Sequence, residues 1–263
     1  MNLRTAYVAF QTSADPPLTV AGLLQLPQAK QPLPAVVICH GSDGVDGRGA
    51  FYAQALHAAG VATLEIDMWA ARGTARGAAA RPGSPVETVP DALAALRFAG
   101  RQPEIDAARI GIMGFSWGAV VTLLCATKRH ADRLGGAAPR FAAHAALYPV
   151  CWAYGRVPAL ALTDLTGAPI LIQTGEKDAY DGPDAGEKLI AQLREAGEAP
   201  VRGVTHRGAT HGFDRDLPAQ TIVDPFAHQG AGGEVLMAFH PRAAAAARAE
   251  VVGFFTEMLA SRP

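Results

Sequence analysis

The stretch Arg109–Lys128, RIGIMGFSWGAVVTLLCATK, decides the fold, because it combines a strand, a sharp turn and a helix. The apolar run Ile110–Met113, interrupted by glycine, is typical of a strand buried on both faces of a parallel sheet. From about Gly118 to Lys128 the residues favour a helix. The pattern therefore predicts a strand that passes into a helix through a tight turn, with Ser116 at that turn.

The turn itself, GFSWG, has the form G-x-S-x-G. Gly114 and Gly118 lack side chains, so strand and helix can pack closely while Ser116 takes a strained backbone conformation. That geometry lifts the hydroxyl above the sheet, where the unpaired N–H groups of the helix start face whatever is bonded to it. The pentapeptide alone is common by chance, but its strand-turn-helix context favours a nucleophilic role for Ser116.

Composition narrows the class of protein. The chain has 263 residues, of which 49% are hydrophobic, so it can bury a substantial core, and we expect one domain over residues 1–263. A net charge of -1 gives no electrostatic reason to expect nucleic acid or an anionic membrane as a partner. The expected partner is a small organic molecule, bound by a monomer or a small homo-oligomer.

The cysteines and the N-terminus point to a reducing compartment. Cys39, Cys125 and Cys151 are odd in number and lack metal-ligand spacing, so we expect core packing, no metal and no organic cofactor. The first ten residues, MNLRTAYVAF, lack the basic and apolar regions of a signal peptide, and no run of about twenty apolar residues occurs elsewhere. The cytoplasm is the expected location.

Strand and helix patterns alternate along most of the chain. Two β-like runs, 4–10 and 18–26, flank Asp15-Pro16-Pro17 and predict an antiparallel pair at a sheet edge. Further strands are expected at 35–39, 61–67, 110–113, 141–148, 169–174 and 201–206, and helices at 49–59, 86–100, 118–128, 184–196 and 241–259. This alternation predicts one doubly wound α/β domain with a mostly parallel sheet. Residues 214–241 either cover the site or merely connect elements.

A serine hydroxyl needs a base to take its proton, and the base needs an acid to fix its tautomer. Asp178 and His211 each lie just past a late strand, and serine, acid, histidine is the chain order of the α/β-hydrolase architecture. His211 lies in a glycine-flanked loop that can reach the turn. The competing candidates are Asp181, Asp184 and Glu176 for the acid, and His206 and His228 for the base.

The loop His40–Gly44, HGSDG, follows the buried strand at 35–39. An acyl-transfer enzyme of this layout needs a second oxyanion donor there, so we assign the N–H groups of Trp117 and Ser42 to an oxyanion hole. An ordinary turn between strand and helix is the alternative. His40 is expected to orient the loop.

Other residues are candidates for the pocket. Tyr148 and Trp152, at the end of the strand expected at 141–148, would shape an acyl or alcohol pocket over Ser116, although plain packing fits them equally well. The loop 68–85 carries Arg72, Arg76 and Arg81, for which substrate contact and simple solvation are equally compatible.

Four segments together resemble the dienelactone hydrolase family of the α/β-hydrolase superfamily: HGSDG, GFSWG, GEKD and ATHGF, in this order over most of the chain. The resemblance implies a nucleophile at Ser116, an acid at Asp178 and a base at His211, with oxyanion N–H groups from Ser42 and Trp117. It also implies that Arg215, four residues after the histidine, binds a substrate carboxylate, with Arg72 as its less secure partner.

The sequence departs from the family pattern twice. The founding enzymes use cysteine where this chain has Ser116, and a thiol-activating glutamate where it has Gly41. Losing both is chemically coherent, because a serine paired with histidine needs no such carboxylate. The departure puts dienelactone itself in doubt as the substrate.

We therefore predict a serine hydrolase that cleaves carboxylic esters or lactones of small organic molecules through a Ser-His-Asp triad and an acyl-enzyme. The alternatives are a peptidase or acyl-sugar esterase with the same triad, or a non-catalytic α/β-hydrolase used as a small-molecule receptor. The presence of all three triad residues argues against the receptor.

Overall fold

The computed structural model describes residues 2–74, 77, 80–132 and 139–260 and is built on an eight-stranded sheet. The strands lie in the order β1-β2-β4-β3-β5-β6-β7-β8. The bounds are β1 Leu3–Gln11, β2 Thr19–Pro27, β3 Leu33–Cys39, β4 Ala62–Asp67, β5 Ile105–Phe115, β6 His144–Leu147, β7 Ile170–Gly175 and β8 Val201–His206. β1 and β2 are antiparallel, as is the pair of β2 and β4, and all other neighbours are parallel. The mostly parallel sheet with an antiparallel N-terminal pair is thus confirmed.

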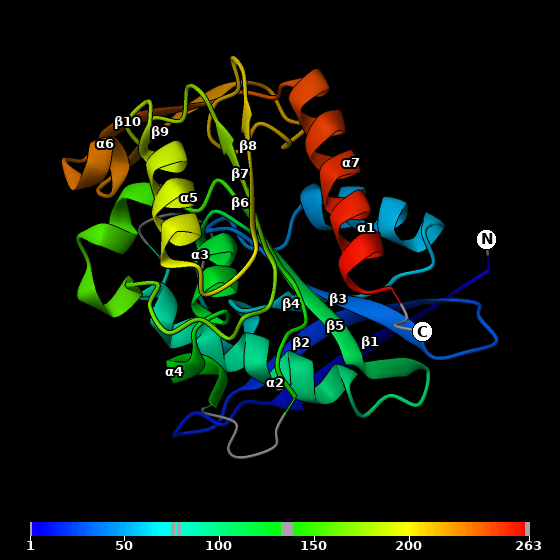
Figure 1. The fold of residues 1–263 in the computed structure, drawn as a ribbon. Coiled ribbons are helices and arrows are strands. Elements are labelled where there is room, and N and C mark those ends of the chain that lie inside the picture. Colours follow the sequence, from blue (N-terminus) through cyan, green and yellow to red (C-terminus); the bar gives the residue numbers. More distant parts are fainter. Residues whose placement is uncertain (1, 75–76, 78–79, 133–138, 261–263) are drawn as a thin grey trace.

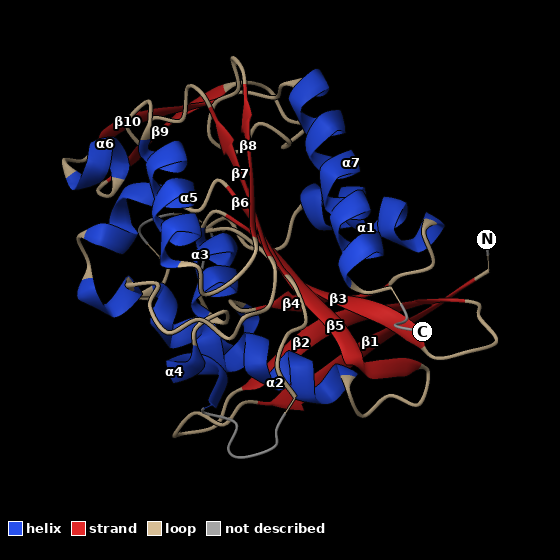
Figure 2. Cartoon of the chain, in the orientation of Figure 1, coloured by secondary structure: helices blue, strands red, loops and turns tan. Residues whose placement is uncertain are grey.

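Helices cover both faces of the sheet (Figure 1). α1 (Gly47–Ala58) and α7 (Pro241–Met258) lie on one side, and α2 (Val89–Ala99), α3 (Trp117–Leu124) and α5 (Ala185–Ala196) lie on the other. Figure 2 shows the strands as a twisted layer between these two groups. The short elements are α4 Lys128–Ala131, η1 Ala70–Arg72, η2 Pro85–Thr88, η4 Cys151–Gly155 and η5 Pro158–Leu160.

The sheet separates two hydrophobic cores because successive side chains of a strand point to opposite faces. On β3, Val36 and Ile38 join the cluster formed with α1 and α7. Val37 and Cys39 join the cluster formed with α2, α3 and α5. A strand that is buried on both faces has a continuous run of apolar residues. The sequence of β3 therefore predicts a position in the middle of the sheet. In the described part of the chain, no helix combines the length and the apolar character needed to cross a membrane.

Several expected boundaries were wrong. The helix expected at 118–128 ends at Leu124, because the carbonyl of Leu124 accepts hydrogen bonds from the backbone N–H and the hydroxyl of Thr127. The helix expected from residue 86 begins with the 3₁₀ turn η2, which Ser84 and Glu87 cap reciprocally. β5 begins earlier than expected, since Ile105 pairs with Leu33 of β3.

Residues 214–239 lie between β8 and α7 and form what we call the hairpin segment. It contains β9 (Gln220–Asp224), α6 (Ala227–Gly230) and β10 (Gly233–Met237), with β9 and β10 paired as an antiparallel ribbon. The N–H of His240 donates to the carbonyl oxygen of Phe213 at 2.8 Å, so the segment leaves and returns at one point. Its apolar residues Ala227, Val235 and Met237 pack against Tyr180 from the loop after β7.

Glu65 on β4 is a partly buried carboxyl group that makes stability depend on pH. Burial, followed by the charge of Asp46, raises the pKa of Glu65 from its usual 4.5 to about 7. The folded chain therefore retains a proton that the unfolded chain loses near pH 4.5. Stability falls as the pH rises between those two values and is lowest above pH 7.

Replacing Glu65 with glutamine should remove this penalty. The full shift corresponds to roughly 3 kcal/mol, and contact with solvent reduces the expected gain in free energy of unfolding at pH 8 to about 2 kcal/mol. At pH 4, below both pKa values, the gain should nearly vanish. Urea denaturation at both pH values measures it, with Glu195→Gln on the exposed face of α5 as the control. An equal gain at both pH values would contradict the prediction.

Candidate active site

Ser116 lies at the predicted turn between β5 and α3, with φ 50° and ψ -110°. A Cβ added to Gly114 would lie 2.2 Å from the carbonyl oxygen of Gly118, and one added to Gly118 would lie 2.2 Å from that of Cys39. Both positions therefore require glycine. The contact at Gly118 brings the start of α3 against the end of β3, next to the loop His40–Gly44.

Three side chains from distant loops form a continuous hydrogen-bonded chain. His211 Nε2 lies 2.8 Å from Ser116 Oγ, and His211 Nδ1 lies 2.7 Å from Asp178 Oδ2. The side chains of His211 and Asp178 are only 3% and 2% exposed. The other carboxylate oxygen of Asp178 accepts a hydrogen bond from the N–H of Tyr180 at 2.9 Å. This arrangement can move a proton from the serine hydroxyl to the imidazole.

The competing acids and bases are engaged elsewhere. Asp181 accepts the N–H groups of Cys151 and Trp152, and burial raises its pKa to about 6. The remaining pairs are Asp184 with Lys188, Glu176 with the N–H of Gly208, His206 with Gln173, and His228 with the carbonyl of Glu234. The structure therefore brings Asp178 and His211, rather than these candidates, to Ser116.

Two tyrosine rings hold the imidazole of His211. The ring centroids of Tyr180 and Tyr148 lie 4.3 and 4.8 Å from that of His211. Tyr148 is fully buried, and its hydroxyl donates to Asp214 at 2.6 Å and accepts from Arg48 at 3.2 Å. Tyr148 lines neither cavity beside Ser116, so of the two interpretations of this residue the structure favours packing, within a buried polar network beside the imidazole.

The imidazole of His40 fixes the start of the loop His40–Gly44 through both of its nitrogen atoms. The Nε2 of His40 accepts the N–H of Met68 at 2.9 Å, which leaves its Nδ1 to donate to the carbonyl of Gly41 at 2.8 Å. Burial lowers the pKa of His40 to about 4, so the ring stays neutral in this role. His40 thus orients the loop, as the sequence predicts.

Ser42 and Trp117 line one cavity together with Ser116. The carbonyl of Ser42 accepts hydrogen bonds from Trp69 Nε1 at 3.0 Å and from the N–H of Gly77 at 3.1 Å. The hydrogen bonds between described residues include none donated by the backbone N–H of Ser42 or Trp117. The assignment of these two N–H groups to an oxyanion hole stays a prediction with which this geometry is compatible.

Two cavities adjoin Ser116, with volumes of about 130 and 30 Å³. Trp152 lines the larger one, where the sequence places it, and His211 lines the smaller one. The hairpin segment forms part of the wall of both, because Phe226 lines the larger cavity and Ile222 and Met237 line the smaller. Of the two possibilities for this segment, the structure favours a cover over the site.

The structure does not bring Arg72 or Arg215 to Ser116. Arg72 pairs bidentately with buried Asp91 at 2.6 and 3.1 Å and lines neither cavity. Arg215 pairs with Asp43 at 2.8 Å and lies outside both cavities as well. Each guanidinium is paired with a nearby carboxylate, so this arrangement does not support the expected substrate contacts, which stay predictions. Arg76 lies outside the described residues.

Two further residues lie at the site: Arg81, which the sequence left open between substrate contact and solvation, and Tyr180, which sequence reasoning missed. Arg81 lines the larger cavity and pairs bidentately with Asp224 of the hairpin segment, both distances being 2.9 Å. Tyr180 donates its hydroxyl to the same Asp224 at 2.8 Å. The position of Tyr180, two residues after Asp178, was a usable signal. The carboxylate partner of Arg81 lies 143 residues away, so no local sequence signal indicated their pairing.

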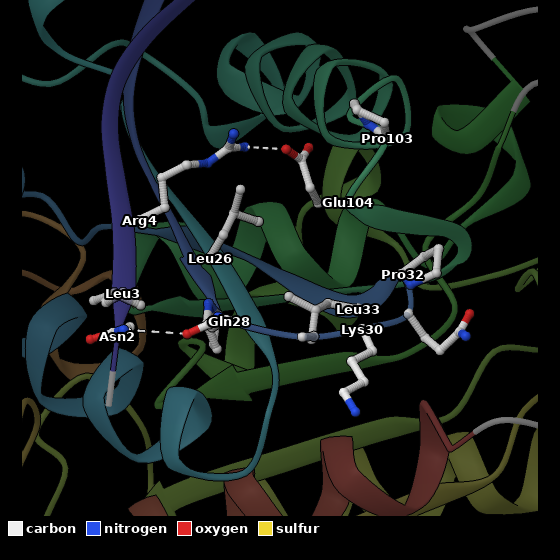
Figure 3. Close-up of a pocket in the computed structure, with 13 residues that line it drawn as sticks. Asn2, Leu3, Arg4, Leu26, Gln28, Lys30, Pro32, Leu33, Pro103 and Glu104 are labelled. Atoms are coloured by element: carbon white, nitrogen blue, oxygen red, sulfur yellow. Dashed lines mark hydrogen bonds and ion pairs between the residues drawn. The ribbon is translucent and has the colours of Figure 1, made fainter.

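A larger hollow of about 700 Å³ lies at the amino ends of β3 and β5 (Figure 3). Four of its polar side chains pair with one another, Arg4 with Glu104 and Asn2 with Gln28. Its lining contains no serine, cysteine or histidine. Among the described residues, no group of three or more metal-ligating side chains could hold a metal ion. Size alone therefore does not locate the chemistry, which we expect at Ser116.

Comparison with known proteins places the chain in a family. The model of the dienelactone hydrolase family matches residues 20–259. Uncharacterised proteins from two strains of Mycobacterium tuberculosis are 29% identical over 201 residues, which is 73% of this chain and 67% of theirs.

Solved structures share the fold. A dienelactone hydrolase-like promiscuous phosphotriesterase from metagenomic libraries has a TM-score of 0.70 at 19% identity, covering 98% of this chain and 99% of its own. A dienelactone hydrolase from Anabaena variabilis gives 0.62 at 18%, covering 99% and 100%. A hyperthermophilic esterase from the archaeon Pyrobaculum calidifontis gives 0.65 at 15%, covering 98% and 87%. The fold is that of the α/β-hydrolases, and with its family model matched over most of its length this chain belongs to the dienelactone hydrolase family.

Proposed function

We propose that this protein is a serine hydrolase that cleaves carboxylic esters or lactones of small organic molecules through an acyl-enzyme. The observation that carries the proposal is the hydrogen-bonded chain from Asp178 through His211 to Ser116 at the wall of two cavities. Membership of a hydrolase family supports it.

In the first half-reaction, His211 Nε2 takes the proton of Ser116 while Oγ attacks the ester carbonyl carbon. Asp178 accepts the hydrogen bond of Nδ1–H and stabilises the imidazolium that forms. The carbonyl oxygen becomes an oxyanion, for which the N–H groups of Ser42 and Trp117 are the proposed donors. Each donor should lower the barrier by roughly 3 kcal/mol. When the tetrahedral intermediate collapses, the imidazolium protonates the departing alcohol.

In the second half-reaction, His211 takes a proton from water, whose oxygen attacks the acyl carbon bound to Ser116. Collapse returns the proton to Oγ and releases the acid. The buried side chains of Asp178 and His211 favour this cycle, because a hydrogen bond between such groups is stronger where water is excluded.

Labelling with a fluorophosphonate tests the nucleophile directly. The reagent should phosphonylate one residue, and digestion followed by mass spectrometry should find the adduct on the peptide that contains Ser116. Phenylmethylsulfonyl fluoride provides a second, chemically different reagent. If neither reagent forms an adduct, the receptor alternative is favoured. If labelling succeeds, the rates of hydrolysis of a panel of lactones, short esters and peptides separate an esterase or lactonase from a peptidase.

Replacing Asp178 with asparagine should lower kcat for p-nitrophenyl acetate by on the order of 10⁴, because an amide in that place favours the wrong imidazole tautomer. The matched control is Asp184→Asn, which removes an exposed carboxylate paired with Lys188 and should change kcat less than twofold. A loss below tenfold for Asp178→Asn would remove Asp178 from the mechanism.

A further inference from the structure

The two cavities at Ser116 divide the substrate between them. An ester bound with its carbonyl carbon at Oγ must direct its acyl group and its alcohol to different sides. His211, which has to protonate the departing alcohol, lines the smaller cavity and not the larger. Of the two proposed oxyanion donors, Trp117 lines the larger cavity and not the smaller, whereas Ser42 lines both. The larger cavity is therefore on the acyl side.

The acyl side is apolar. Its hydrophobic wall combines residues from α3, from the segment after β6 and from the hairpin segment: Trp117, Val120, Val150, Trp152, Leu160 and Phe226. Its volume of about 130 Å³ is close to that of an apolar protein cavity of about 150 Å³ that holds benzene. A group of that size fills it and displaces water from the wall.

Arg81 is the cationic side chain among the described residues that line this cavity, and its charge is already matched. Its side chain is 8% exposed, and that of its bidentate partner Asp224 is 1% exposed. The same guanidinium donates to Ser42 Oγ at 3.0 Å and lies over the rings of Trp117 and Phe226. A substrate carboxylate could recruit Arg81 only by breaking a buried ion pair, which is costly.

Building on the proposed function, we propose that the site selects esters whose acyl group is uncharged, apolar and no larger than about a benzene ring, and that the Arg81–Asp224 pair excludes acyl groups bearing a carboxylate. Carboxylate-bearing acyl groups are excluded because Asp224 of this chain already occupies the guanidinium of Arg81. An anionic acyl group would be left unpaired in an apolar cavity.

Two ethyl esters of nearly equal shape test this. Ethyl 4-methylpentanoate ends in an isopropyl group where monoethyl succinate carries a carboxylate. Hydrolysis followed by titration of released acid in a pH-stat should give a kcat/KM for the neutral ester higher by on the order of 100-fold, because the carboxylate must be desolvated without a partner. The small ethoxy group keeps the alcohol side constant.

Asp224→Asn should then shift the preference toward monoethyl succinate by at least about tenfold, because it releases the charge of Arg81. The readout is the ratio of the two kcat/KM values. Because both values scale with the concentration of folded enzyme, a variant that is partly unfolded gives the same ratio. Asp164→Asn, at an exposed ion pair with Lys128, is the matched control and should leave the ratio unchanged.

The outcomes separate the two proposals. If the wild type is labelled by the fluorophosphonate but hydrolyses monoethyl succinate as well as its neutral partner, the selection against charge is wrong while the hydrolase stands. An unchanged ratio in Asp224→Asn would show that the ion pair does not set the preference. Absence of both labelling and hydrolysis would overturn the proposed function itself.

Trp152→Ala tests the size limit. Enlarging the wall should raise kcat/KM for ethyl 2-naphthoate relative to ethyl benzoate by about tenfold, since one more fused ring then fits. A ratio equal to that of the wild type would show that the acyl group binds elsewhere.

Discussion

Ser116→Ala is expected to lower kcat for p-nitrophenyl acetate by on the order of 10⁶, leaving only the rate that binding and oxyanion stabilisation provide. The variant keeps the backbone of the turn, whose φ of 50° is imposed by the close packing of Gly114 and Gly118 rather than by the hydroxyl. It loses one hydrogen bond to His211, so its melting temperature should fall by only a few degrees. Initial rates and a thermal melt measure the two effects.

The matched control for this variant is Ser13→Ala, which removes an exposed serine hydroxyl from the connection between β1 and β2. It should hydrolyse the ester at the wild-type rate. If Ser116→Ala retained most of its activity while remaining folded, another group would have to attack the carbonyl, and the assignment of the nucleophile would fail.

His211→Ala is expected to cost a similar factor, on the order of 10⁶ in kcat, because serine and base act as one unit. The loss should appear in both half-reactions, so no acyl-enzyme burst should be seen. Imidazole added to the assay should restore part of the rate, since the vacated space lies between the rings of Tyr148 and Tyr180. Stopped-flow release of p-nitrophenol measures the burst and the rescue together.

Two further variants separate loss of the base from loss of packing. His211→Gln retains a polar side chain of similar reach but cannot accept and return a proton, so it should be as inactive as the alanine variant. His228→Ala, whose imidazole bonds to the carbonyl of Glu234 in the hairpin segment, should stay within a few-fold of wild type. Substantial activity in His211→Gln would show that the imidazole only fills space.

The sequence was sufficient to predict the turn and its partners because each has a local cause. The strain at Ser116 needs glycine on both sides, and Asp178 and His211 follow strands whose apolar runs place their ends at the same edge of a parallel sheet. The sheet itself was predictable for the same reason. Its buried strands carry continuous apolar runs that no solvent-exposed segment would tolerate.

The arginines could not be assigned in this way. Arg72 ends the short 3₁₀ turn η1, whereas Arg81 and Arg215 lie in loops. The position of each guanidinium depends on the carboxylate it meets, which is 19 residues away for Arg72 and 143 residues away for Arg81. A long charged side chain can reach several partners at little cost in strain. Which one it chooses depends on tertiary packing, and a family resemblance in the surrounding motif does not determine it.

The hairpin segment was equally hidden, because its short strands pair only with each other and its turn uses residues such as His228 and Gln229 with positive φ. The secondary-structure propensities of histidine and glutamine do not predict a positive φ at these positions. The sequence thus indicated where the chemistry should occur, whereas the walls that decide what enters came from contacts over long distances.

The hydrogen bond between His240 and Phe213 has an evolutionary consequence. Since both ends of residues 214–239 meet at one spot on the sheet scaffold, a shorter or longer stretch can be exchanged there without altering β8 or α7. Exchanging this segment would replace Asp224 and Phe226 together, and the proposed selectivity for the acyl group would change with them. A single recombination event in this segment would therefore change which esters the protein accepts, while Ser116, His211 and Asp178 are inherited unchanged.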